Sequence, residues 1–172
     1  MNDCLMSIDG TDFRIPQQGP AVKGNPFSSH KFKGKCALRY ELGVDIVEGN
    51  LVWIEGPCPA GKCSDIVIFR QTLIHHLDPF ERVVADDGYI GEAPVRVKAP
   101  GLRLDSSEDR AMQSVVRSRH ETLNGRFKFW EILKQPFRHD ILEHGQIFRA
   151  IAVIIQLGID EGDKLFSVVY SD

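Results

Sequence analysis

The stretch Met6-Ser-Ile-Asp-Gly-Thr-Asp-Phe-Arg14 places a carboxylate, Asp9, where a short strand-like run ends. A second stretch, Arg82-Val-Val-Ala-Asp-Asp-Gly-Tyr89, places Asp86 at the end of another apolar run, and Glu121 lies in a long helical pattern. An acid at the end of a buried strand is costly unless it is paired or binds a cation. Three acids that converge in an α/β fold would bind a hard divalent metal, so the sequence predicts this fold class and this kind of site.

Length and composition are typical of one globular domain, and we expect residues 1–172 to form it. The chain is 42% hydrophobic and 26% charged, which is ordinary for a globular protein. Its longest apolar run, Ile151-Ala-Val-Ile-Ile155, is too short to span a bilayer. Asp3 and Cys4 interrupt any secretory signal at the start, so no membrane partner is expected.

Cysteine usage argues against a structural zinc site. The four cysteines are Cys4, Cys36, Cys58 and Cys63, and no two of them form a CxxC pair. We expect reduced thiols in an intracellular protein.

Charge is segregated along the chain although the net charge is only −3. Residues 28–39 carry four basic and no acidic side chains, and residues 110–138 carry seven basic against two acidic ones, a net +5. Residues 139–172 carry two basic against six acidic side chains, a net −4. A basic middle and an acidic tail suit a nucleic-acid groove on one face. Taken alone, the same pattern is more typical of solvated surfaces.

Periodicity and turn residues predict an α/β element order. Strands are expected at residues 4–9, 36–47, 51–56, 82–86, 95–98 and 165–170, and the second and third form a hairpin. Residues 14–34 are rich in Pro, Gly, Ser and Gln and are expected to form a loop. Helices are expected at residues 65–77, with Ser64 as N-cap, at 106–134 and at 139–158.

The expected helix 106–134 has two distinct faces. One shares the side of Glu121 and is polar and basic: Arg110, Ser114, Arg117, Asn124, Gly125 and Lys128. The other is apolar: Met112, Val116, Leu123, Phe127 and Trp130. The polar face can be explained by solvent and by an Arg117–Glu121 ion pair contributing about 0.3–0.5 kcal/mol. In a phosphate-lined groove, its cations would instead bind phosphates while Glu121 holds a metal. His120 is expected on the helix surface.

Several motifs, in order, carry a family resemblance. They are Asp9-Gly-Thr, then Asp86-Asp-Gly-Tyr, then Arg117, three residues, Glu121, six residues and Lys128. This order resembles the DDE superfamily of transposases and endonucleases. The segments VRSRHETLNGRFK (116–128), HKFK (30–33), LRYEL (38–42) and PAGKCSD (59–65) resemble the PIF/Harbinger-like group. The resemblance extends from Ser7 to about Tyr170.

The resemblance implies an RNase H-like fold, a mixed sheet flanked by helices. It implies that Asp9, Asp86 and Glu121 are the catalytic and metal-binding acids, with two Mg²⁺ ions that Mn²⁺ can replace. Arg117 and Lys128, joined by Arg110 and Asn124 on the same face, would bind DNA phosphates. The implied activity is DNA phosphodiester hydrolysis followed by 3′-end transfer. The implied partners are transposon ends and target DNA, in a homo-oligomer, in the nucleus.

Two departures keep alternatives open. Ser114 stands where the family places a tyrosine, and only eight residues precede Asp9, so we expect the N-terminal DNA-recognition region of the family to be absent from this chain. A truncated or domesticated derivative that binds DNA or protein without cutting it is therefore the main alternative. A nuclease acting on RNA or hybrids is another. Asp9 and Asp86 can also simply end strands in turns. For Asp12 we expect a spectator role, for Asp65 a helix-starting role, and for Asp87 a variable position in the motif.

Overall fold

The protein is a mixed α/β structure built on a five-stranded sheet. The computed structural model describes residues 4–20, 24–100 and 107–165, with side chains of the last range described from residue 113. The strands are β1 (Cys4–Arg14), β2 (Ala37–Asp45), β3 (Leu51–Pro59), β4 (Arg82–Val84) and β5 (Val97–Lys98). Their order in the sheet is β3-β2-β1-β4-β5. The predicted class, a mixed sheet flanked by helices, is confirmed.

Strand directions follow the lengths of the connections. β1, β2 and β3 pair antiparallel and form a meander, whereas β4 pairs parallel with β1 and β5 pairs parallel with β4. Parallel neighbours need a long crossover, and α1 lies between β3 and β4 in the chain. The parallel pairing of β1 with β4 ends at Ser7 and Val84, while β1 continues to Arg14 beside β2.

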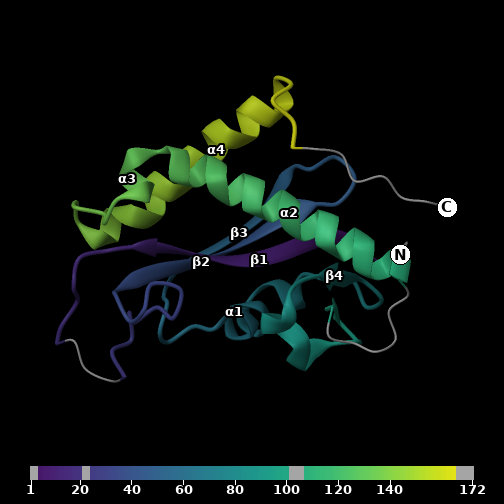
Figure 1. The fold of residues 1–172 in the computed structure, drawn as a ribbon, viewed down its shortest axis with the longest axis horizontal. Coiled ribbons are helices and arrows are strands. Elements are labelled where there is room, and N and C mark those ends of the chain that lie inside the picture. Colours follow the sequence, from purple (N-terminus) through teal and green to yellow (C-terminus); the bar gives the residue numbers. More distant parts are fainter. Residues whose placement is uncertain (1–3, 21–23, 101–106, 166–172) are drawn as a thin grey trace.

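Helices cover both faces of the sheet (Figure 1). One face packs against α2 (Ser107–Phe129), α3 (Glu131–Lys134) and α4 (His144–Asp160), preceded by the short 3-10 helix η3 (Ile141–Glu143). The other face packs against α1 (Asp65–Gln71), η1 (Leu73–His75) and η2 (Asp87–Glu92). Side chains alternate across β1, so Phe13 joins the first layer and Ile8 the second.

Several element boundaries differ from those predicted. β1 and β3 run longer than expected, because each keeps pairing with β2 through residues that turn chemistry alone would assign to loops. The expected helix 65–77 is α1 followed by η1, and Ser64 is its N-cap without a side-chain capping bond. The expected helix 106–134 breaks at Trp130, whose backbone is extended. The strand expected at residues 165–170 lies outside the described residues, apart from Leu165.

An aromatic cluster joins α2 and α4 to the sheet. Phe148 of α4 stacks on Phe127 of α2 with ring centroids 4.5 Å apart, and on Tyr40 of β2 at 3.8 Å. Phe13 of β1 meets Phe148 edge-on at 5.2 Å. These contacts hold α2 at a fixed height above β1, which matters because α2 carries Glu121.

The helical stretch Ile141–Asp160 is long and apolar enough to cross a bilayer by length and composition. The apolar run Ile151–Ile155 alone did not indicate this, because residues on both sides of it extend the helix. Core helices pass the same test, and a third of this stretch is buried inside the structure. Phe148, Ile151 and Ile155 face the sheet.

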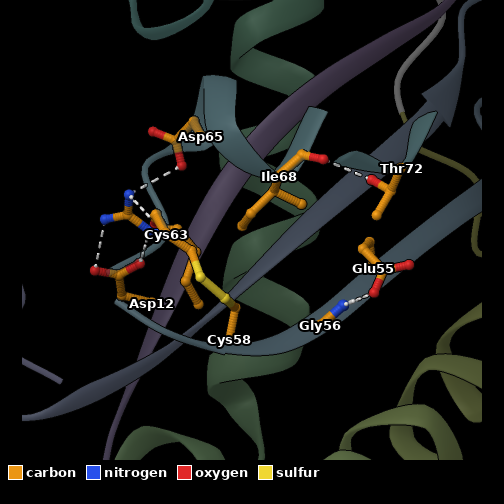
Figure 2. Close-up of a disulfide and its surroundings, with 9 residues drawn as sticks. Asp12, Glu55, Gly56, Cys58, Cys63, Asp65, Ile68 and Thr72 are labelled. Carbon is orange, nitrogen blue, oxygen red and sulfur yellow. Dashed lines mark hydrogen bonds and ion pairs between the residues drawn. A yellow bond between two sulfur atoms is a disulfide. The ribbon is translucent and has the colours of Figure 1, made fainter. Parts of the chain in front are cut away.

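The cysteine prediction was wrong for one pair. Cys58 and Cys63 form a disulfide across the turn that leaves β3, with their Cα atoms 6.2 Å apart (Figure 2). Cys4 and Cys36 are buried and take no part in this disulfide. Sequence spacing did not reveal the pair, because only the extension of β3 to Pro59 and the return of the chain toward α1 bring the two sulfurs together.

Candidate active site

Two of the three predicted acids meet because β1 and β4 are parallel. The last residue pair between the strands is Ser7 with Val84. Asp9 and Asp86 each lie two residues beyond that pair. The carboxyl ends of parallel strands open at the same edge of a sheet, so both acids lie at one edge.

α2 brings the third acid to the same place. A small pocket of about 80 Å³ is lined by Asp9, Asp86, Glu121 and Arg117, together with Ser7, Ile8, Val84, Ala85, Val116 and His120. Residues from β1, the end of β4 and α2 therefore surround one hollow. Glu121 and Arg117 are exposed and one turn apart on α2, whereas Asp9 and Asp86 are half-buried.

Asp9 is held in a low-dielectric position. The Asn124 side-chain amide of α2 donates to Asp9 Oδ2 at 3.2 Å. Burial raises the pKa of Asp9, and the nearby Asp86 raises it further, while Lys31 and the Asn124 hydrogen bond oppose the shift. Asn124 Oδ1 is itself buried and has no hydrogen-bond partner among the described residues. A carboxylate in this setting gains from a bound cation, because a cation compensates both the lost solvation and the neighbouring acid.

Asp86 also serves the turn that follows β4. It is the N-cap of η2, and its Oδ1 accepts a hydrogen bond from the Gly88 amide at 2.8 Å. This hydrogen bond confirms the interpretation of Asp86 as a turn residue. The two roles are compatible, because a carboxylate has a second oxygen and further lone pairs.

A fourth acid, Asp65, lies beside this pair on the α1 face of the sheet. A Cβ atom built on Gly10 would lie 1.8 Å from Asp65 Oδ1, and one built on Gly88 would lie 3.4 Å from Asp65 Oδ2. Burial raises the pKa of Asp65, Arg39 and Lys31 oppose the rise, and Asp9 and Asp86 add to it. Asp65 begins α1, as predicted, but it also borders the two glycines that follow the predicted catalytic aspartates.

The buried guanidinium of Arg39 contacts Asp65 and fixes its position (Figure 2). Arg39 Nη1 lies 3.3 Å from Asp65 Oδ1 and donates to the Cys63 carbonyl at 3.2 Å. Its Nε and Nη2 bind both oxygens of Asp12, at 2.7 and 3.1 Å. Asp12 is 3% exposed, so it has a structural role in this ion pair, which its description as a spectator beside Asp9 did not include. A bidentate pair of this kind is strong and directional.

A lysine reaches the same edge from the loop before β2. The Lys31 ammonium donates to the carbonyl oxygen of Gly10, next to Asp9. Its charge opposes the rise in pKa of both Asp9 and Asp65, so it acts on both acids. In the sequence, Lys31 was one of four basic residues in 28–39 and part of the HKFK motif (30–33), but neither pattern placed it beside Asp9.

Two residues on the buried side of α2 were also missed. His120 is 4% exposed, and its Nε2 lies 2.9 Å from Ser7 Oγ, so the expected surface position was wrong. Burial lowers the pKa of His120 to about 4. Arg119 is buried too and donates to the carbonyl of Ile46 at 2.7 Å. The signal was present, because both residues fall on the helical stripe of Val116 and Leu123.

The remaining predicted site residues lie farther out. Lys128 is exposed one turn beyond Asn124 on α2, and the side chain of Arg110 lies outside the described residues. Within the described part of the chain, no three His, Cys, Asp or Glu side chains stand close enough together to hold a metal ion. Binding one ion through Asp9, Asp86 and Glu121 therefore requires side-chain movement, for which exposed Glu121 has the room.

The donor chemistry fits a hard divalent cation. All candidate ligands are oxygen atoms, which Mg²⁺ and Mn²⁺ prefer, and the buried Asn124 Oδ1 beside them has no hydrogen-bond partner within the described structure. No protein-family model, curated protein or solved structure matches the chain.

Proposed function

We propose that this chain is the catalytic core of a metal-dependent DNA endonuclease or transposase of the DDE type. The observation that carries the proposal is the single pocket lined by Asp9, Asp86, Glu121 and Arg117. These residues are separated by up to 112 positions in the chain and come from three different elements. Their resemblance to the DDE motifs rests on order and spacing, which are independent of this spatial grouping.

The RNase H-like fold belongs to the same proposal. Three antiparallel strands followed by two short parallel ones, in the order β3-β2-β1-β4-β5, support it. So does the position of the acids, with Asp9 on the central strand, Asp86 after its parallel neighbour and Glu121 on a helix packed over that strand.

Each residue has a role in the proposed chemistry. Asp9, Asp86 and Glu121 would hold divalent ions, which when bound supply an activated water or 3′-hydroxyl and stabilise the leaving oxygen of an in-line displacement. Arg117, on the rim of the pocket, would bind a phosphate oxygen and orient the DNA strand. Asn124 orients the Asp9 carboxylate through its hydrogen bond. DNA as partner, an oligomeric assembly and a nuclear location remain predictions.

Cleavage of supercoiled plasmid by the purified chain tests this proposal. We expect nicking that requires Mg²⁺ or Mn²⁺ and stops with a chelator. Asp86→Asn should abolish it, whereas Asp87→Asn, a substitution at the adjacent exposed acid, should leave most of it. Both variants lose one negative charge in the same turn, so the comparison isolates the position of the carboxylate.

Two outcomes would overturn the proposal. Nicking that survives in Asp86→Asn at the wild-type rate would show that another site or a contaminant cuts the DNA. Absence of nicking by the folded wild-type chain with both metals would favour the alternative of a derivative that binds without cutting.

A further inference from the structure

The loop before β2 is a defined structure around Lys31. Ser28 bridges to Cys36, and the Ser29 amide donates to the Lys35 carbonyl at 3.0 Å. The Gly34 amide returns to the Ser29 carbonyl at 2.8 Å. Lys33 and Gly34 have positive φ angles of 52° and 84°, which let the chain reverse within a few residues. The loop therefore has one preferred shape, with Lys31 at its exposed tip.

A buried acid anchors this loop to the site. Ser29 Oγ donates to Asp12 Oδ2, and Ser29 is fully buried. The same Asp12 binds Arg39, which in turn contacts Asp65. Asp12 thus connects the loop that carries Lys31 with Arg39, which contacts Asp65. Lys31 and Asp65 both lie near Asp9.

Lys31 occupies the part of the β1 edge that β4 leaves uncovered. β4 pairs with β1 only as far as Ser7, and the Lys31 ammonium contacts the Gly10 carbonyl three residues further on. Arg39 also approaches this region, but it is buried and binds Asp12, Asp65 and the Cys63 carbonyl. Lys31 is exposed, so an incoming anion can reach it.

We propose that Lys31 is a DNA phosphate-binding residue of the candidate active site. An ammonium has three N–H donors, so it can keep the Gly10 carbonyl and still donate to a phosphate oxygen. A DNA strand that approaches Asp9, Asp65 and Asp86 meets negative charge, and a cation at that edge offsets the repulsion. Arg117 on α2 and Lys31 on the loop would contact the strand from two different elements. The inference rests on the proposed function, because it takes DNA as the substrate.

The competing explanation is that Lys31 only compensates the charge of Asp9 and Asp65. The two explanations predict different effects of Lys31 on the salt dependence of DNA binding. A residue that contacts a phosphate changes the salt dependence of binding, with a slope change of about 0.9 in log Kd against log salt. A residue that only compensates the acids leaves that slope unchanged.

Fluorescence anisotropy of a labelled duplex, in EDTA and from 50 to 200 mM salt, separates them. We expect Lys31→Met to reduce the slope by about 0.9 and Lys31→Arg to retain it. Lys35→Met, at an exposed position of the same loop, is the matched control and should match the wild type. An unchanged slope in Lys31→Met, or an equal fall in both methionine variants, would overturn the inference.

This test is independent of cleavage. Loss of slope in Lys31→Met without any nicking by the wild type would contradict the proposed nuclease and retain the phosphate contact. Normal nicking by the wild type with an unchanged slope in Lys31→Met would contradict the phosphate contact alone. Circular dichroism of each variant verifies that the loop substitution has not unfolded the chain.

Discussion

The carboxylate of Asp65 lies directly over Gly10, so closely that a Cβ atom at Gly10 would be 1.8 Å from Asp65 Oδ1. Gly10 follows Asp9 in β1, and Asp9 points to the α2 face while Asp65 comes from the α1 face. A single residue without a side chain thus separates acids that belong to opposite layers. The close approach explains why this position of β1 is a glycine.

Gly10→Ala should destabilise the fold by about 1–3 kcal/mol, because the new methyl group must displace Asp65 or bend β1. Nicking should fall as well, since Asp9 is the next residue. Gly125→Ala is the control, because a Cβ there meets nothing within 4 Å and α2 gains helix propensity, worth about 0.5–1 kcal/mol. Urea denaturation measures both. Equal stability of the two variants would contradict the placement of Asp65.

Because Glu41 is buried, we expect the protein to lose stability as the pH rises. Glu41 is fully buried opposite Gly10, and its Oε1 accepts a hydrogen bond from the Trp53 indole at 3.1 Å. Burial raises its pKa from 4.5 to about 7. The folded state then binds more protons than the unfolded state between pH 4.5 and 7, so stability falls across that window, by roughly 3 kcal/mol.

Glu41→Gln should remove this fall, because glutamine keeps the acceptor for Trp53 and does not ionise. Denaturation midpoints at pH 5, 6, 7 and 8 compare it with the wild type. Glu48→Gln, a substitution at an exposed acid after β2, is the control and should follow the wild-type profile. A Glu41→Gln curve parallel to the wild type would show that Glu41 does not carry the effect.

Because His120 is buried, we expect the opposite trend at lower pH, where stability is lost as the pH falls. Its folded pKa of about 4 lies below the ordinary value of 6.5, because burial disfavours the imidazolium. The unfolded state therefore binds more protons between pH 4 and 6.5, and stability is lost as the pH falls through this window. His144, buried against Tyr40 and also shifted to about 4, adds to the loss.

His120→Asn should lose less stability than the wild type between pH 6.5 and 4. His139→Asn, at an exposed histidine, should retain the full loss. If both variants lose as much as the wild type, the burial of His120 against Ser7 is not what sets the acid sensitivity.

Much of the sheet was predictable from short-range patterns. Alternating and continuous apolar runs predicted the positions of β1 to β5, and carboxylates at the ends of two such runs predicted the pair Asp9 and Asp86. The face of α2 that carries Glu121, Arg117 and Asn124 followed from helical spacing. Each of these predictions uses residues that lie within one element.

The missed features all depend on contacts between distant segments. Asp12 and Arg39 are buried together because β1 and β2 pair in a register that no local pattern specifies. Lys31 reaches Gly10 because Ser29 is anchored on Asp12. The Cys58–Cys63 disulfide depends on the path of one turn after β3. His120 is the exception, since the apolar stripe of α2 already included its position.

Arg39 should be among the most costly positions to change. Arg39→Met leaves Asp12 buried without its cation, which typically costs about 3–5 kcal/mol. Adding Asp12→Asn should recover part of this loss, because the unpaired charge is then gone. A double variant no more stable than Arg39→Met would show that the ion pair is not the source of the loss. Chemical denaturation of the single and double variants gives the comparison.

Calorimetric titration of Mn²⁺ into the purified chain is the most direct test of the claim that Asp9, Asp86 and Glu121 form one metal site. We expect saturable binding that weakens at least tenfold in each of Asp9→Asn, Asp86→Asn and Glu121→Gln, because each loses a direct ligand, and loss of a supporting group alone typically weakens binding about 10–100-fold. Asp87→Asn should bind like the wild type. Equal binding by Asp86→Asn and Asp87→Asn would rule out this metal site, because binding would then not depend on the acid at the end of β4.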